Sequence, residues 1–364
     1  MPDYNDEIAD LEAQIKKTVY NKATQHHIGM VKAKIAKLRE KAEARSKGSG
    51  PKSGFEVRKT GDGTVILLGF PSTGKSTLLN ALCGTKSEVA SYAFTTLTVI
   101  PGTLEYEHAR IQILDVPGIV AGAASGRGRG KEVLATIRNA DLCMLVIDAL
   151  RPHELEVVRR EAASVGVRLN QRRPDVRIKR TAKGGVHVAT TVALTRIDAE
   201  TITDILKEFR INNADVVVRE DIDVEQFIDC IEDNKKYMPG IVVCNKDDLI
   251  SDEQRKDIAQ RYAPDIFVSG QTESGIEKLK RLIYDRLDLM SVYLKEPGKE
   301  PDMNVPLIVF RNSTIRAVCE KLHKDFVSKF KFARVWGPSA KFNGQKLMLG
   351  HKLKDSDVLE IHVK

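Results

Sequence analysis

One stretch of the sequence has the residue types and the spacing of a phosphate-binding site. It reads Gly69-Phe70-Pro71-Ser72-Thr73-Gly74-Lys75-Ser76-Thr77. In the spacing G-x-x-x-x-G-K-S, backbone N–H groups of the loop and of the following helix N-terminus face phosphate oxygens. Lys75 would reach the β- and γ-phosphates, and the Ser76 hydroxyl suits Mg²⁺, which prefers hard oxygen ligands. This spacing defines a phosphate-binding P-loop, and it predicts a site for a nucleoside triphosphate.

A second motif indicates which base is bound. It reads Asn245-Lys246-Asp247-Asp248 and follows an apolar run. The Asp248 carboxylate can accept two hydrogen bonds from N1–H and the exocyclic amine of guanine, a donor pair that adenine lacks. We expect Asn245 to bond either the base edge or the P-loop, and the stem of Lys246 to pack on a ring face. Ser269 and Gly270 follow the next strand, where a backbone N–H would meet guanine O6.

Two further segments fit the metal and the γ-phosphate. A threonine about twenty residues after the P-loop lysine binds Mg²⁺ in small GTPases, and we expect this to be Thr96, with Thr95 as the alternative. Asp115, at the end of an apolar run, would hold the Mg²⁺ shell, and the Gly118 N–H would meet the γ-phosphate. The expected metal ligands are therefore Ser76, Thr96 and Asp115.

The group that activates the attacking water is not evident. Ile119 stands where Ras-like enzymes carry a glutamine. We expect in-line attack of water on the γ-phosphate, with Lys75, Thr96 and Gly118 acting on the reacting phosphate, and slow turnover by the isolated protein. Arg127 and Arg129 could act in catalysis or contact a partner, and the sequence leaves their role open.

The elements that would position these residues indicate an α/β fold. Val65 to Leu68 reads as a buried strand ahead of the P-loop, and a helix follows the loop. We predict a P-loop GTPase domain with an inserted α+β subdomain, an N-terminal helical hairpin and a C-terminal β-grasp domain. The predicted limits are 1–46 for the hairpin, 47–60 for a linker, 61–150 and 239–290 for the G domain, 151–238 for the insertion, and 291–364 for the β-grasp domain.

The insertion is strongly basic. Seven cations crowd between residues 168 and 183, namely Arg168, Arg172, Arg173, Arg177, Lys179, Arg180 and Lys183. Such a cluster favours contact with RNA or with an acidic protein, although a solvated face is the alternative.

Composition limits the class of protein. The chain has 364 residues, is 42% hydrophobic and 30% charged, and carries a formal net charge of +8. We expect a cytoplasmic protein, because no apolar run approaches the length of a membrane span and the N-terminus is too polar for a signal peptide. The five cysteines have no C-x-x-C spacing, so neither a disulfide framework nor a zinc site is predicted.

Taken in order, the motifs resemble those of the developmentally regulated GTP-binding proteins, a branch of the Obg-like translation-factor GTPases. The matching segments are the P-loop, Phe94-Thr95-Thr96-Leu97-Thr98, Asp115-Val116-Pro117-Gly118-Ile119, Gly126-Arg127-Gly128-Arg129-Gly130, Asn245-Lys246-Asp247-Asp248, Asn21-Lys22-Ala23-Thr24 and Val335-Trp336-Gly337. Thr73 departs from the family's usual valine and Gly270 from its usual alanine. Some relatives recruit K⁺ through an asparagine at the position of Ser72, so K⁺ stays open as a second cofactor beside Mg²⁺.

The resemblance implies a helix-turn-helix N-terminus, a ribosomal-S5-like insertion and a C-terminal TGS domain. It also implies a GTP-binding and GTP-hydrolysing switch that acts in the cytoplasm with ribosomes, contacting rRNA or tRNA. A dedicated regulatory protein would bind the chain as a heterodimer, and no membrane is involved. The competing hypothesis is an RNA-binding or ribosome-assembly factor in which GTP is mainly structural.

Overall fold

The computed structural model describes residues 4–19, 21, 24–46, 61–84, 100–115, 137 and 139–363. The chain forms two compact units. One comprises Met1–Gly54 with Gln171–Tyr237, and the other Phe55–Asn170 with Met238–Lys364. Each unit is therefore built from segments that are distant in the sequence.

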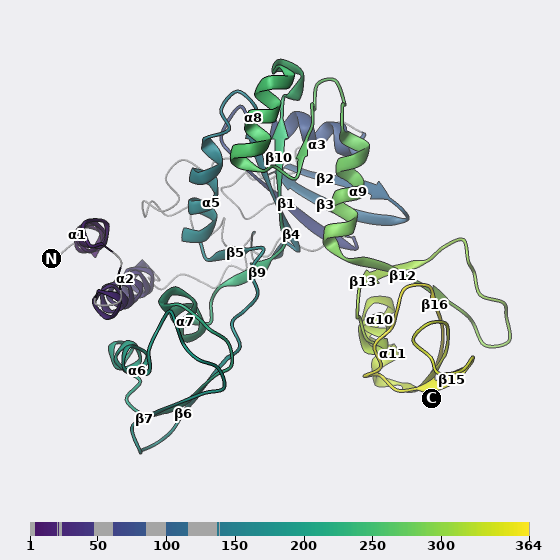
Figure 1. Ribbon diagram of the computed structural model, residues 1–364. Helices are drawn as coiled ribbons and strands as arrows, with labels where there is room; N and C mark the ends of the chain where they lie inside the picture. The colour runs from purple at the N-terminus through teal and green to yellow at the C-terminus, as the bar shows by residue number, and fades with distance from the viewer. Residues whose placement is uncertain are drawn as a thin grey trace. The chain divides into compact units, whose positions relative to one another are not determined.

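The second unit contains the central, mostly parallel sheet (Figure 1). Its described strands pair in the order β11-β10-β4-β1-β3-β2, and only β2 runs antiparallel to its neighbour. The strands are β1 (Gly63–Leu68), β2 (Ile100–Tyr106), β3 (Ala109–Asp115), β4 (Leu142–Asp148), β10 (Gly240–Asn245) and β11 (Ile266–Phe267). Every residue of β1, β4 and β10 is buried, as expected for parallel strands covered on both faces.

Helices cover both faces of this sheet (Figure 1). Helices α5 (Glu154–Ser164) and α8 (Asp252–Tyr262) pack on one face, and α3 (Lys75–Cys83) and α9 (Ile276–Leu287) pack on the other. In an open α/β sheet, ligands bind at the carboxyl ends of the strands. The P-loop follows β1 and the Asn245 motif ends β10, so both motifs lie at that edge.

The structure places the start of the insertion later than residue 151. The apolar side chains of α5, including Leu155 and Val158, are buried in the core of the central sheet, so this helix belongs to the second unit. The chain leaves that unit after Asn170, whose side chain donates to the Gly240 carbonyl (3.0 Å) and accepts from the Gly240 N–H (2.8 Å). These two bonds fix the base of the insertion. The short strands β5 (Val167–Leu169) and β9 (Lys236–Met238) flank it in the sequence.

The first unit contains a smaller sheet with the order β6-β8-β7. Its strands are β6 (Val176–Arg180), β7 (Val186–Thr190) and β8 (Ala214–Val218). Helices α6 (Ala199–Glu208) and α7 (Val224–Glu232) bury their apolar sides with one face of this sheet. Both helices begin at aspartate N-caps, Asp198 and Asp223, whose carboxylates accept backbone N–H groups that the helix cannot satisfy.

The N-terminal hairpin is part of the same unit. Helices α1 (Tyr4–Lys17) and α2 (Gln25–Ser46) share a cluster that includes Leu11 and Ile35. Helix α2 also packs on α6 and α7. A Cβ on Gly29 would lie 3.1 Å from Thr201 Cγ2 and 3.3 Å from Val224 Cγ2, which shows how closely α2 approaches both helices.

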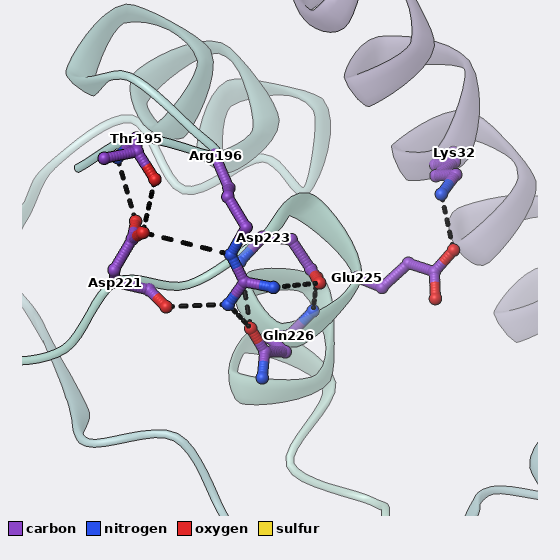
Figure 2. Close-up of polar contacts among 7 residues, drawn as sticks. All are labelled: Lys32, Thr195, Arg196, Asp221, Asp223, Glu225 and Gln226. Atoms are coloured by element: carbon purple, nitrogen blue, oxygen red, sulfur yellow. Dashed lines mark hydrogen bonds and ion pairs between the residues drawn. The ribbon is translucent and has the colours of Figure 1, made fainter. Parts of the chain in front are cut away.

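Polar contacts reinforce this junction (Figure 2). Lys32 of α2 forms an ion pair with Glu225 at the start of α7. Within the insertion, at the same end of α7, the Arg196 guanidinium donates to the Asp221 carbonyl (2.7 Å) and to Gln226 Oε1 (3.1 Å). The hairpin and the insertion are thus held together by a buried apolar interface with charged pairs at its rim.

The C-terminal region forms a β-grasp domain. Its described strands pair in the order β13-β12-β16-β14-β15. The elements are β12 (Leu289–Leu294), β13 (Leu307–Phe310), α10 (Ile315–Leu322), α11 (Lys324–Ser328), β14 (Phe330–Trp336), β15 (Gln345–Leu347) and β16 (Asp357–Val363). Val292, Val318 and Leu359 are fully buried between the sheet and α10.

Candidate functional site

The two glycines that frame the P-loop have no room for a side chain. A Cβ on Gly69 would lie 2.3 Å from the Val146 carbonyl oxygen, which belongs to the backbone of β4. Gly74 has a φ of +82°, and a Cβ there would lie 2.5 Å from Asn245 Nδ2. The loop can therefore pass between β4 and Asn245 only with glycine at both positions.

Lys75 folds back over the loop that precedes it. Its buried ammonium donates to the carbonyl oxygens of Gly69 (2.9 Å) and Phe70 (2.8 Å). An ammonium has three donors, and these carbonyls use two of them. Burial lowers the pKa of Lys75, while the negative charge of Asp115 acts in the opposite direction. These two hydrogen bonds therefore hold the Lys75 side chain, with its positive charge, against the P-loop.

Ser76 and Asp115 meet at the start of α3. The Ser76 hydroxyl donates to Asp115 Oδ2 at 2.9 Å. Asp115 is only 3% exposed, and its second oxygen, Oδ1, has no hydrogen-bond partner within the described part of the chain. A buried carboxylate oxygen without a partner is costly. A hydroxyl and a carboxylate oxygen are also the hard ligands that Mg²⁺ prefers, so this pair fits a divalent cation.

Asn245 joins three segments of the site. Its Nδ2 donates to the Thr73 carbonyl oxygen (2.9 Å), and its Oδ1 accepts from the Gly270 N–H (3.0 Å). The sequence left open whether Asn245 bonds the base edge or the P-loop. In the structure its amide is used by the P-loop and by the loop after β11, and it is 2% exposed.

Removal of this amide is expected to destabilise the site. Asn245→Ala leaves the Thr73 carbonyl and the Gly270 N–H buried without this hydrogen-bond partner. Each such group lowers the free energy of unfolding by about 1–3 kcal/mol. We expect the variant to unfold at a clearly lower temperature and to bind GDP at least tenfold more weakly. Thermal unfolding and titration with a fluorescent GDP analogue measure both effects. Asn212→Ala is the control, because Asn212 is exposed; equal values for both variants would contradict the bridging role.

Lys246 has a partner that the sequence motifs did not reveal. Its ammonium lies 2.7 Å from Asp148 Oδ2, at the buried end of β4. Burial acts to raise the pKa of Asp148, but hydrogen bonds from Lys246, from the Leu150 N–H and from Arg151 outweigh it, so the net pKa is lowered. The available signal was an aspartate at the carboxyl end of a buried strand, where ligand sites of α/β sheets lie.

The residues expected to read the base lie on two neighbouring loops. Asp248 is exposed within the short 3₁₀ helix Asp247–Leu249, and the Asp247 N–H donates to the Val268 carbonyl (3.1 Å), which joins the loops. Ser269 is fully buried, and its hydroxyl accepts from the Thr272 N–H (3.1 Å). A Cβ on Gly270 would lie 3.1 Å from the Leu78 nitrogen, so the family's usual alanine would require a small shift here.

The remaining P-loop positions shape the loop. Pro71, Ser72, Ser76 and Thr77 are exposed. Ser72 has a φ of 65°, and the Thr73 hydroxyl donates to the Phe70 carbonyl (3.0 Å). Most of the predicted site residues therefore lie at one edge of the central sheet of the second unit. They are Gly69 to Thr77, Asp115, Asn245, Lys246, Asp248, Ser269 and Gly270. The predicted Thr96 and Gly118, together with Ile119, Arg127 and Arg129, lie outside the described residues.

Comparison with known proteins places the chain in a family. A family model described as "50S ribosome-binding GTPase" matches residues 64–180, the model of the C-terminal region of that domain matches 183–289, and the TGS domain model matches 290–363. These matches confirm the predicted fold class. In the described part of the chain, the helices are too short or too polar to cross a bilayer.

Full-length relatives agree with the domain matches. A GTP-binding protein of Methanocaldococcus jannaschii is 53% identical over 99% of this chain and 93% of its own length. Developmentally-regulated G-protein 3 of Arabidopsis thaliana is 42% identical over 97% of both chains. Developmentally-regulated GTP-binding protein 1 of Xenopus laevis is 41% identical over 97% of both chains. As the motifs predicted, the chain belongs to the family of developmentally regulated GTP-binding proteins.

Proposed function

We propose that the protein is a GTP-binding and GTP-hydrolysing molecular switch that uses Mg²⁺ and acts with ribosomes. The observation that carries the proposal is the Asn245 bridge. It ties the P-loop, through the Thr73 carbonyl, to the loop that would present a backbone N–H to guanine O6. One buried amide thereby sets the separation between the phosphate end and the base end of a bound nucleotide.

Each part of GTP binding and hydrolysis would be carried out by particular residues of this chain. Lys75 and the P-loop N–H groups hold the β- and γ-phosphates and stabilise the charge that develops as water attacks. Ser76 and Asp115 would hold Mg²⁺, with Thr96 as the third ligand expected from the sequence. When bound, Mg²⁺ supplies positive charge to the phosphate oxygens. Asp248 would accept the two guanine donors.

Association with ribosomes is supported by family membership and by charge. The matching family model is described as a 50S ribosome-binding GTPase, and the chain carries a net charge of +8. A basic protein is attracted to polyanions such as rRNA and tRNA. We further propose that the protein acts in the cytoplasm and forms a heterodimer with a regulatory protein, as the family resemblance implies.

Hydrolysis of GTP by the purified protein tests the proposal. We expect slow turnover by the protein alone, because Ile119 replaces the water-orienting glutamine, and at least a tenfold increase on addition of ribosomes. Assays in sodium and in potassium buffer determine whether a monovalent cation completes the water site. Tight GTP binding without stimulation by ribosomes would instead favour a factor in which GTP is mainly structural.

A further inference from the structure

Within the described part of the chain, no element packs on one face of the small sheet of the first unit, and we call this the uncovered face. Helices α6 and α7 bury the other face, where Ala214, Val216 and Val218 of β8 are at most 1% exposed. The uncovered face carries Arg177 and Lys179 of β6, Asp215 and Val217 of β8, and His187 and Ala189 of β7. All of these residues except Val217, which is half-buried, are exposed.

A strip of cations runs along this face and beyond its end. We call it the basic strip and define it as Arg177 and Lys179 of β6 and Lys183 of the turn that follows this strand. All three side chains are exposed, and none has an ion-pair partner among the residues that the structure describes. The described residues of the uncovered face include one acidic side chain, that of Asp215. It lies opposite Lys179 in the strand register.

Other cations of the same unit are used internally. Lys32 pairs with Glu225 and Arg196 contacts Asp223, as Figure 2 shows. Lys37 pairs with Glu208. Positive charge is therefore neutralised where α2 and the insertion pack together, and it is left available on the side of β6.

The geometry of the turns extends the strip past the sheet. The Thr181 N–H donates to the Asn213 carbonyl (3.1 Å), and the Gly185 N–H donates to Asn213 Oδ1 (2.9 Å). These bonds hold the turn that carries Lys183 against Asn213, the residue before β8. Gly184 and Gly185 have φ values of 110° and 82°, so the turn requires glycine and presents bare backbone to an approaching ligand.

Protection of a sheet edge does not account for these charges. Lysine and arginine on an edge strand discourage pairing with other chains, and β6 is an edge strand. The opposite edge strand, β7, reads Val186-His187-Val188-Ala189-Thr190 and contains neither lysine nor arginine. The concentration of cations on β6 alone indicates a ligand with negative charge.

We infer that the basic strip binds the phosphate backbone of double-stranded RNA. Arg177 and Lys179 are two residues apart on one strand, which spaces their Cα atoms by roughly 6.6 Å and points both side chains to the same face. Duplex RNA is recognised through its phosphates and shape. Single-stranded RNA is bound by stacking its bases on aromatic rings, and the described residues of this face include no Phe, Tyr or Trp.

A protein partner is less well matched to this surface. Protein interfaces bury an apolar centre that often contains aromatic residues. The described part of this face has little apolar surface, because its apolar side chains are those of Ala189 and the half-buried Val217. The choice of RNA as the polyanion rests on the proposed association with ribosomes. The surface itself is defined by its own charges and contacts.

Binding of a fluorescent 20-base-pair RNA duplex to the full-length protein, followed by anisotropy at several salt concentrations, tests the inference. We expect the double variant Arg177→Gln/Lys179→Gln to bind about tenfold more weakly, and the slope of log K against log salt to fall by roughly one for each phosphate that is no longer bound. The matched control is Lys16→Gln/Lys17→Gln, which removes the same charge from exposed positions of α1 in the same unit. It should bind like the parent protein.

Several outcomes would overturn the inference. Equal weakening in both double variants would show that net charge alone drives binding. Tighter binding of a single strand, of duplex DNA of the same sequence, or of a glutamate-rich peptide to this surface would identify a different ligand. GTP binding is measured on every variant in parallel. If the parent protein hydrolyses GTP in a ribosome-stimulated manner but does not bind the duplex, the inference about this surface fails and the proposed function stands. If it binds the duplex but does not hydrolyse GTP, the proposed function fails and the inference about this surface stands.

Discussion

Replacement of Lys75 by alanine is expected to weaken GTP binding at least a hundredfold. The ammonium is buried beside the P-loop and is held by the carbonyls of Gly69 and Phe70, so its charge is fixed where the β- and γ-phosphates would lie. Hydrogen bonds to a charged group contribute about 1.5–3 kcal/mol each. The third donor of the ammonium and its positive charge would both act on the phosphate oxygens, and a loss of about 3 kcal/mol corresponds to a factor of roughly 100 in affinity. Isothermal titration with GTP and with GDP measures the change.

A control separates loss of binding from loss of folding. Lys278→Ala removes an exposed lysine of α9, and substitutions at such surface positions change stability little. This variant should bind GTP like the parent protein. Thermal unfolding of both variants without nucleotide reports on the fold. Normal GTP affinity in a folded Lys75→Ala protein would contradict the assignment of the P-loop.

Replacement of Asp248 by asparagine is expected to change the preferred base. The carboxylate can accept both N1–H and the exocyclic amine of guanine, and two bonds to a charged group contribute about 3 kcal/mol or more. An asparagine keeps an acceptor for N1–H but turns its NH₂ towards the amine. Affinity for GTP should fall roughly a hundredfold, while XTP, which has a carbonyl in place of that amine, should bind better than GTP. Competition between the two nucleotides measures the preference.

The neighbouring aspartate supplies the matched control. Asp247 Oδ2 lies 3.4 Å from the Arg255 guanidinium, whereas Asp248 is exposed. Asp247→Asn should therefore keep the preference for guanine. A change of preference in the Asp247 variant, or unchanged discrimination against ATP and XTP in the Asp248 variant, would show that the base is read by another group.

Much of the site could be predicted because its chemistry is local in the sequence. A P-loop needs its glycines, lysine and serine at fixed spacing, since one short turn must present N–H groups, an ammonium and a hydroxyl to the same phosphates. The buried run before Gly69 and the helix after it follow from hydrophobic periodicity alone. The family could be recognised for the same reason, because several such local motifs occur in one order.

The partners of these residues could not be predicted, because they come from distant strands. Lys246 meets Asp148 only because β10 and β4 pair in parallel with Asn245 opposite Asp148. A shift of one residue in that register would turn the side chains to the other face. The two candidate roles of Asn245 likewise differed in which loop lay nearby, and that depends on how the P-loop and the loop after β11 pack against β10.

The division into units also depended on tertiary packing. The sequence of α5 shows an amphipathic helix but not the surface that it covers, and only its burial against the central sheet assigns it there instead of to the insertion. The periodicity of α2 shows the apolar side that meets α1. Its approach to α6 and α7, through Gly29, requires a second complementary surface that is distant in the sequence. The local motifs and the family follow from the amino-acid sequence. Which distant side chains meet depends on the tertiary structure, because burial and strand register act between segments that share no local pattern.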